Sequence, residues 1–174
     1  MKRTFADGAV AIDEDLAHHP IVRTLPAVTA QSVYANMLRR EIAPGLRALG
    51  FRGSGSKFVL PRVDWWQIVA FQKDYHSDAE HIRFTVNLTV ANKAAWAADR
   101  EYEPSLPVSP SGNTSYWYET EKRIRLGNLM PPRGEDRWWD VIAGVPTDPV
   151  AELVVSAIER RALPWFRTEC AAAE

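Results

Sequence analysis

The clearest pattern in the sequence is an alternation of apolar and polar residues along residues 82–91. Successive side chains of a β-strand point to opposite faces of the sheet, so an alternating strand has one apolar and one polar face. The apolar set is Ile82, Phe84, Val86, Leu88 and Val90, and the polar set is Arg83, Thr85, Asn87 and Thr89. The pattern predicts a sheet that packs against helices on one face and carries polar groups on the other.

Three more strands are predicted from apolar and aromatic runs between turn residues, over residues 57–62, 65–73 and 116–126. In the last of these, Trp117, Arg123 and Arg125 have the parity opposite to that of the apolar residues. A continuous strand therefore adds these three side chains to the polar face. Residues 138–142 suit either a short helix or a strand, and periodicity does not decide between them.

The strands over residues 65–73 and 82–91 are expected to pair as an antiparallel hairpin. Setting Phe71 opposite Phe84 keeps the apolar side chains of both strands on one face. The same register places Gln72 beside Arg83 on the polar face.

Helices are predicted near both ends of the chain. Thr29 caps the first helix, whose apolar stripe runs to Leu49, and Pro44 kinks or divides that helix. Asp148 caps the last helix, and Pro164 ends it.

Together these elements predict an α+β fold: an antiparallel sheet of about four to five strands with the N-terminal and C-terminal helices packed on one face. A length of 174 residues favours one domain. We assign this domain to residues 29–166, with a proline-rich loop or insertion over 99–115. Residues 1–28 are expected to form an arm, laid over the domain or left mobile, and residues 167–174 a tail.

Composition and charge narrow the classes of function. The formal net charge is -1, which argues against a whole-domain interface with nucleic acid, and no apolar run reaches the length that spans a membrane. Cys170 is the only cysteine, so no internal disulfide can form, and we expect a cytoplasmic protein.

Two segments carry residue types that suggest chemistry. Residues 50–57 contain the glycine, serine and lysine of a phosphate loop, but they connect a helix to a strand, which is the reverse of that motif, so a plain connector is favoured. The spacing of residues in the acidic loop 74–81 does not fit a calcium loop, so a solvated loop is favoured. His76 and His81 of this loop are weak candidates for metal ligands. We predict no cofactor.

Several short motifs follow one another along residues 33–166. They are Leu49-Gly50-Phe51, Phe71-Gln72-Lys73, Phe84-Thr85-Val86-Asn87-Leu88, Arg123-Ile124, Trp138-Trp139 and Leu163-Pro164-Trp165-Phe166. On these residues the chain resembles a bacterial family catalogued only as a domain of unknown function, DUF4304. The resemblance supports the fold and implies no catalytic residue.

The polar face gathers the groups with the greatest capacity for recognition. The candidate binding residues are Trp66, Gln72, Arg83, Asn87, Trp117, Arg123 and Arg125. Flat aromatic rings, amides and guanidinium groups together can bind carboxylates, peptide backbone or a stacked base. The opposing interpretation is that the proline-rich loop covers this face or that it is simply solvated.

Our leading hypothesis is a non-enzymatic bacterial binding protein, of the immunity or accessory kind, whose polar face engages a protein partner. The alternative is a small-molecule transferase or hydrolase with a pocket between this face and the loop over 99–115, where Gln72, Asn87 and Arg123 orient a polar or anionic substrate. A local excess of basic residues also occurs, at Arg39, Arg40, Arg47, Arg52, Lys57 and Arg62. We interpret it as a solvated helix face, and we do not expect nucleic acid as the partner.

Overall fold

The alternating segment forms the centre of the sheet. In the computed structural model, which describes residues 28–114 and 119–172, β4 (His81–Asn92) pairs with β3 along one edge and with two separate strands, β5 and β6, along the other. The other strands of this six-stranded antiparallel sheet are β1 (Arg52–Ser54), β2 (Lys57–Leu60), β3 (Trp65–Lys73), β5 (Glu121–Arg125) and β6 (Trp139–Ile142). The predicted α+β class is confirmed, and residues 139–142 form a strand rather than a helix.

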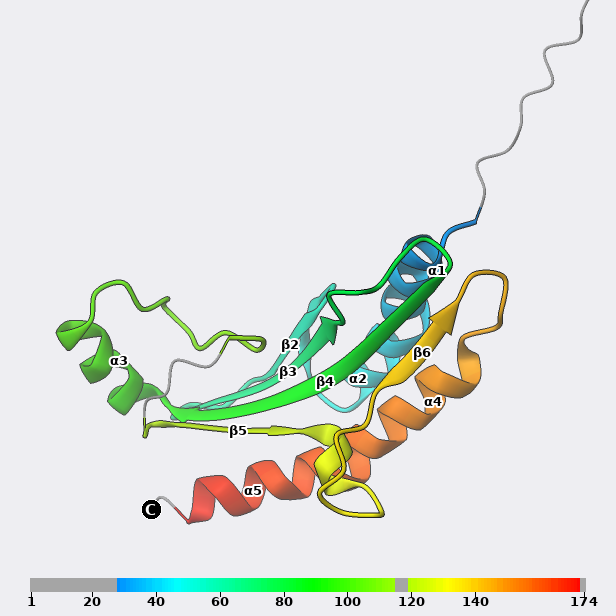
Figure 1. Ribbon diagram of the computed structural model, residues 1–174. Coiled ribbons are helices and arrows are strands. Elements are labelled where there is room, and N and C mark those ends of the chain that lie inside the picture. The colour runs from blue at the N-terminus through cyan, green and yellow to red at the C-terminus, as the bar shows by residue number, and fades with distance from the viewer. Residues whose placement is uncertain (1–27, 115–118, 173–174) are drawn as a thin grey trace, which may run out of the picture.

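Two interrupted helices pack on the apolar face of the sheet (Figure 1). The first consists of α1 (Ala30–Met37), the π-helical turn η1 (Leu38–Ile42) and α2 (Ala43–Ala48), and the second of α4 (Asp148–Ala157), the π-helical turn η3 (Ile158–Ala162) and α5 (Leu163–Ala171). The side chain of Thr29 accepts a hydrogen bond from the backbone N–H of Ser32, which confirms the predicted cap. All five apolar residues of the alternating set in β4 lie in the core between sheet and helices.

Each interrupted helix has its π-helical turn just before a proline, Pro44 in the first and Pro164 in the second. Proline lacks a backbone N–H, and its ring clashes with the carbonyl four residues earlier. The wider turn changes the hydrogen-bond pattern at that point: the N–H of Leu163 donates to the carbonyl of Ile158, five residues back. The prediction that Pro164 ends the last helix is therefore wrong, and the helix continues to Ala171.

The hairpin of β3 and β4 has a different register from the one predicted. Phe71 pairs with Val86 rather than with Phe84, and the whole hairpin shifts by two residues. The connecting loop has its own structure, in which the carboxylate of Asp78 accepts two backbone N–H groups of the loop. Because side chains alternate with a period of two, this shift leaves every residue on its predicted face.

Part of the polar face is covered by the segment 103–114, which returns over the sheet from helix α3 (Lys93–Tyr102) at the end of β4 (Figure 1). Trp96 of α3 is only 1% exposed, and its indole N–H donates to the carbonyl of Pro107. Ile68 of β3 is buried beneath this segment. The sequence pattern did not predict α3, so the proline-rich loop starts later than expected.

A connector was expected between the first helix and β2, but β1 and β2 form a tight antiparallel hairpin there. Gly55 lies at its turn with φ of 61°, a left-handed conformation that favours glycine. Within the described residues, none of the helices combines the length and apolar character needed to cross a bilayer.

Gly112 allows the segment 103–114, which we call the covering segment, to pack directly on the sheet. A Cβ atom built on this residue would lie 2.0 Å from the Cβ atom of Ala70. We therefore expect Gly112→Ala to lower the free energy of unfolding by about 1–3 kcal/mol, as overpacking does, and to expose residues 103–114 to proteolysis. Thr114→Ala, an exposed change in the same segment, is the control. Identical melting and cleavage of the two variants would contradict this contact.

Candidate functional site

The polar face divides into a covered part and an open part. The covered part along β4 includes Thr85, Asn87 and Thr89, all of which are buried. Asn87 bonds to Asn113 of the segment 103–114, and the hydroxyl of Thr85 donates to the backbone carbonyl of Arg137. The open part lies where β4 passes from β5 to β6, and there Arg83 is exposed. The two parts hold different subsets of the predicted binding residues.

In the covered part, the amide side chains bond to one another and to the covering segment. Asn87 Nδ2 donates to Gln72 Oε1 at 2.7 Å and to Asn113 Oδ1 at 3.0 Å, and Asn113 Nδ2 donates to the carbonyl of Phe71. Two predicted residues, Gln72 and Asn87, are thus brought together, but their polar atoms are already used within the protein.

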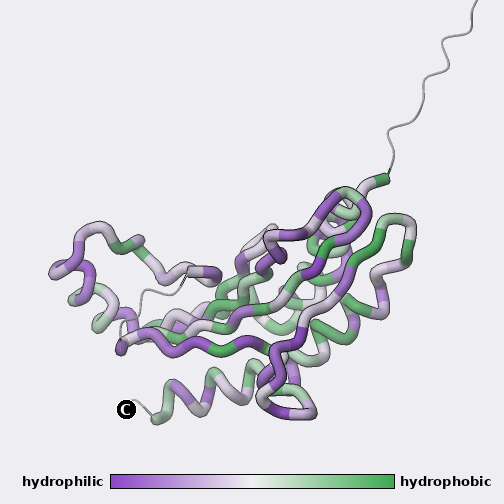
Figure 2. The backbone as a smooth tube through the Cα atoms, viewed as in Figure 1, coloured by the Kyte–Doolittle hydropathy of each residue, from purple (hydrophilic) through white to green (hydrophobic). Residues whose placement is uncertain are grey.

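Arg123 holds the covering segment in place. Its guanidinium group donates to the backbone carbonyls of Ser111 at 2.7 Å and Gly112 at 2.9 Å, and it forms an ion pair with Glu121. Hydrophilic residues predominate along this strand, β5 (Figure 2). The position of Arg123 on the polar face agrees with the prediction, but its guanidinium group bonds to the covering segment of the same chain.

The open part contains a stack of two arginines and one tryptophan. The guanidinium carbons of Arg83 and Arg125 lie 5.5 Å and 5.1 Å from the ring centroid of Trp138, within the range of cation–π attraction. Arg83 comes from β4 and Arg125 from β5, and Trp138 directly precedes β6. We call Arg83, Arg125 and Trp138 the arginine–tryptophan stack.

Three aspartates surround the stack and partly neutralise it. Asp136 forms an ion pair with Arg125 and accepts a hydrogen bond from the indole N–H of Trp138 at 3.1 Å. Asp74 and Asp140 lie 3.8 Å and 4.0 Å from nitrogens of Arg83. The result is a mixed-charge surface around an aromatic ring.

The pKa of Asp136 lies below its ordinary value. Partial burial on its own would raise this pKa, but the hydrogen bonds from Arg125 and Trp138, with the charges of Arg125 and Arg83, outweigh that effect. Asp136 is therefore charged at neutral pH and holds the stack together.

The remaining predicted residues lie apart from the stack. Trp66 lies near the far end of β3, where the ammonium group of Lys93 is 4.8 Å from its ring. Trp117 falls outside the described residues. Sequence reasoning missed Trp138; the available signal was the pair Trp138-Trp139, because adjacent residues of a strand face opposite sides, and Trp139 is indeed buried in the core.

The two histidines proposed as weak metal ligands have other partners. His81 Nε2 lies 2.7 Å from Asp140 Oδ1, and the ring of His76 packs edge-on against Tyr75. In the part of the chain that the structure describes, no group of three or more His, Cys, Asp or Glu side chains is placed to hold a metal ion.

A pocket of about 360 Å³ lies between the sheet and the covering segment. It is lined by Ser56, Lys57, Ala70, Pro107, Val108, Ser109, Ser111, Gly112 and Asn113. The Lys57 ammonium group donates to Ser109 Oγ and to the carbonyl of Pro110, and burial lowers the pKa of Lys57 from its ordinary value. The pocket occupies the place expected for the enzyme alternative.

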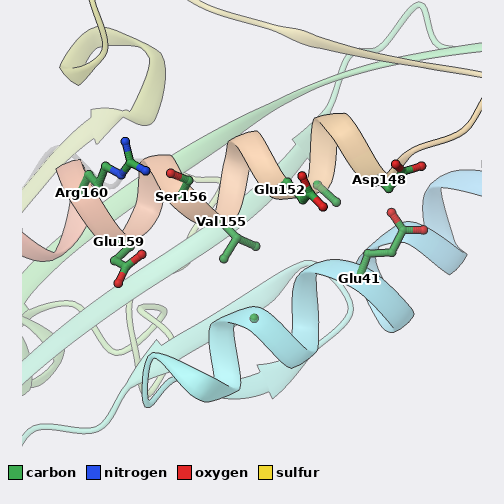
Figure 3. A pocket seen from close by; sticks show the side chains of 9 residues that line it. Glu41, Asp148, Glu152, Val155, Ser156, Glu159 and Arg160 are labelled. Atoms are coloured by element: carbon green, nitrogen blue, oxygen red, sulfur yellow. The ribbon is translucent and has the colours of Figure 1, made fainter.

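A groove of about 560 Å³ runs along the seam between the two interrupted helices (Figure 3). Glu41 reaches toward the start of α4, where its carboxylate accepts hydrogen bonds from the hydroxyl of Thr147 at 2.8 Å and 2.9 Å. Thr147, rather than the predicted Asp148, is the N-cap residue of α4. Gly45 allows Val155 to approach the first helix closely, so the groove is bounded by packing contacts between the helices.

The sequence model of one family, described as "Domain of unknown function (DUF4304)", matches residues 42–168. The match includes all six strands of the sheet, together with α2, α3, α4 and most of α5. No curated protein and no solved structure matches the chain.

The depressed pKa of Asp136 predicts a specific dependence of stability on pH. A carboxylate whose pKa is lower in the folded than in the unfolded state stabilises the fold at neutral pH, and that stabilisation is lost as the pH falls through the folded-state pKa. We expect Asp136→Asn to lower the free energy of unfolding at pH 7 by no more than about 1 kcal/mol, since the ion pair is exposed to solvent.

Urea unfolding of wild type and Asp136→Asn from pH 7 to pH 2 measures this effect, with Asp64→Asn as the control at an exposed aspartate. The difference between wild type and Asp136→Asn should disappear at the acid end. A difference that grew toward low pH would contradict the depressed pKa.

Proposed function

Since this chain belongs to the DUF4304 family of domains of unknown function, and membership assigns no activity, we propose from its own surface chemistry that it is a non-enzymatic binding protein. Its partner is a protein, and the surface that engages it is centred on the arginine–tryptophan stack. The observation that carries the proposal is that both Arg83 and Arg125 contact the ring of Trp138 on the open part of the sheet.

The composition of this surface supports a protein partner. Tryptophan, tyrosine and arginine are the residue types that contribute most to binding energy at protein interfaces. Beside the stack, Tyr75 is 95% exposed, and Ile142, which pairs with His81, is 48% exposed. Exposed apolar side chains around charged groups give both buried contact area and orientation to a docked partner.

The charges of this surface favour a partner that is itself of mixed charge. Two arginines and the aspartates Asp74, Asp136 and Asp140 lie close together, so a strongly acidic or strongly basic partner would meet like charges. This agrees with the net charge of -1, which argues against a whole-domain interface with nucleic acid. A bacterial, cytoplasmic accessory protein of the immunity kind combines these properties, and the lone Cys170 fits a reducing compartment.

Affinity capture from the native host, followed by titration of the purified partner, tests the proposal. We expect Trp138→Ala and Arg83→Gln each to weaken partner binding by about tenfold or more, as loss of a hot-spot side chain does. Tyr102→Ala is the matched control, because it removes an exposed aromatic ring at the opposite end of the sheet face. Equal affinity for wild type and both stack variants would remove this surface as the interface.

The second candidate function is a small-molecule transferase or hydrolase that uses the pocket beside Lys57. The pocket itself supports this candidate, since a lysine with a depressed pKa can serve as a general base or nucleophile. The side chains expected to orient a substrate, Gln72, Asn87 and Arg123, weigh against it, because they bond to other groups of the protein. The binding function is therefore favoured.

The titration of Lys57 tests this second candidate directly. In protein labelled with ¹³C at lysine Cε, we expect the Lys57 signal to titrate below the ordinary pKa of a lysine side chain. Any activity found in a substrate screen should be lost in Lys57→Met and kept in Lys122→Met. An ordinary pKa for Lys57, with activity retained in Lys57→Met, would exclude this pocket as an active site.

A further inference from the structure

A separate pocket of about 320 Å³ lies on the helix-covered side of the sheet, where α2 ends and α5 passes β1 and β2. It is lined by Leu49, Gly50, Arg52, Leu60, Pro61, Arg62, Gln67, Leu163 and Arg167. Two of its arginines, Arg52 and Arg62, belong to the local basic excess of the sequence, which was interpreted as a solvated helix face. Neither lies on a helix: Arg52 is in β1, and Arg62 follows β2.

Three exposed arginines from different parts of the fold, Arg52, Arg62 and Arg167, line this pocket. Arg167 comes from α5, about one hundred residues after Arg52 and Arg62 in the chain. None of the three guanidinium groups has an ion pair or hydrogen-bond partner among the described residues, and none of the nine lining residues is acidic. Bringing three like charges together without a counter-charge is unfavourable, and an anion would relieve it.

Gln67 provides the second, independent observation. This residue of β3 is only 4% exposed, and its Nε2 donates to Cys170 Sγ at 3.1 Å. Its Oε1 is buried and has no hydrogen-bond partner among the described residues. A buried carbonyl oxygen without a donor costs free energy, so a ligand that offers it an O–H or N–H group is favoured.

The remaining walls of the pocket are apolar. Leu49, Leu60, Pro61 and Leu163 line it beside the arginines. A bare inorganic ion would leave this surface unused, whereas the carbon skeleton of an organic anion would cover it. The three features together describe a ligand with an anionic head, a hydrogen-bond donor and a short carbon frame.

We propose that this pocket binds a small hydroxylated organic phosphate, such as a sugar phosphate. The phosphate group presents three terminal oxygens to Arg52, Arg62 and Arg167, more than a single carboxylate offers to three planar donors. A hydroxyl group of the ligand donates to Gln67 Oε1, which requires the buried amide to turn toward the pocket when the ligand binds. The site is independent of the proposed protein-binding surface, since its residues belong to other segments of the chain than the arginine–tryptophan stack.

Isothermal titration calorimetry at low ionic strength, with ribose 5-phosphate, glycerol 3-phosphate, ribose and inorganic phosphate as probes, tests the proposal. We expect the two phosphate esters to bind more tightly than inorganic phosphate, and ribose not to bind. Arg52→Gln and Arg167→Gln should each weaken binding of the esters by about tenfold, the usual effect of removing one charge-assisted hydrogen bond. Arg161→Gln, an exposed arginine that does not line the pocket, is the control and should leave affinity unchanged.

A second measurement locates the ligand without depending on a variant. The side-chain amide signal of Gln67 in a ¹⁵N spectrum should shift on addition of either phosphate ester. Binding of neither ester, an equal loss of affinity in Arg161→Gln, or an unmoved Gln67 amide would each overturn the proposal. Tighter binding of a short single-stranded oligonucleotide, lost in Arg52→Gln and Arg167→Gln, would also overturn it and assign the arginines to nucleic acid.

Discussion

Burial of side chains on both faces of one strand, apolar on one face and polar on the other, is the constraint on which this structure depends. β4 buries its apolar residues against the helices, as its alternation requires, but it also buries Thr85, Asn87 and Thr89 on the opposite face. Buried polar groups need partners: Asn113 of the covering segment bonds to Asn87, and the backbone carbonyl of Arg137 accepts from the Thr85 hydroxyl. Thr89 Oγ1 has no hydrogen-bond partner among the described residues. The third layer over the sheet is thus held by hydrogen bonds, whereas the helical layer is held by apolar packing.

Much of the fold was predictable from the sequence because its strongest signals are local. The alternation over residues 82–91 depends only on the period of a strand, and it gave the correct faces even though the hairpin register was wrong. Helix α3 was missed because its exposed side chains are polar and its single large buried residue, Trp96, makes no periodic stripe. Pro164 was taken as a helix end because a sequence does not show that a π-helical turn can precede it.

The candidate site was less predictable than the fold because it depends on contacts between distant segments. Parity correctly placed Arg83, Arg123 and Arg125 on one face, but it could not show that Arg123 would bond to the covering segment while the other two would flank Trp138. The pocket lined by Arg52, Arg62 and Arg167 could not be predicted for the same reason, because these residues come from β1, the position after β2, and α5. Two chemically distinct surfaces therefore share one small sheet, one rich in mixed charge and the other in unpaired cations.

The two π-helical turns also limit where the chain can gain or lose a residue without disturbing the core. Each turn shifts the positions after it around the helix axis relative to a regular α-helix, and the residues beyond it, Leu46 in the first helix and Phe166 in the second, reach the core in that shifted phase. Removing one residue from either turn would restore regular hydrogen bonding, but it would rotate everything beyond by about 100°. Leu46 or Phe166 would then leave the core. We therefore expect the loops of this domain to accept insertions and deletions, and the spacing from each π-helical turn to its proline to be fixed by the core.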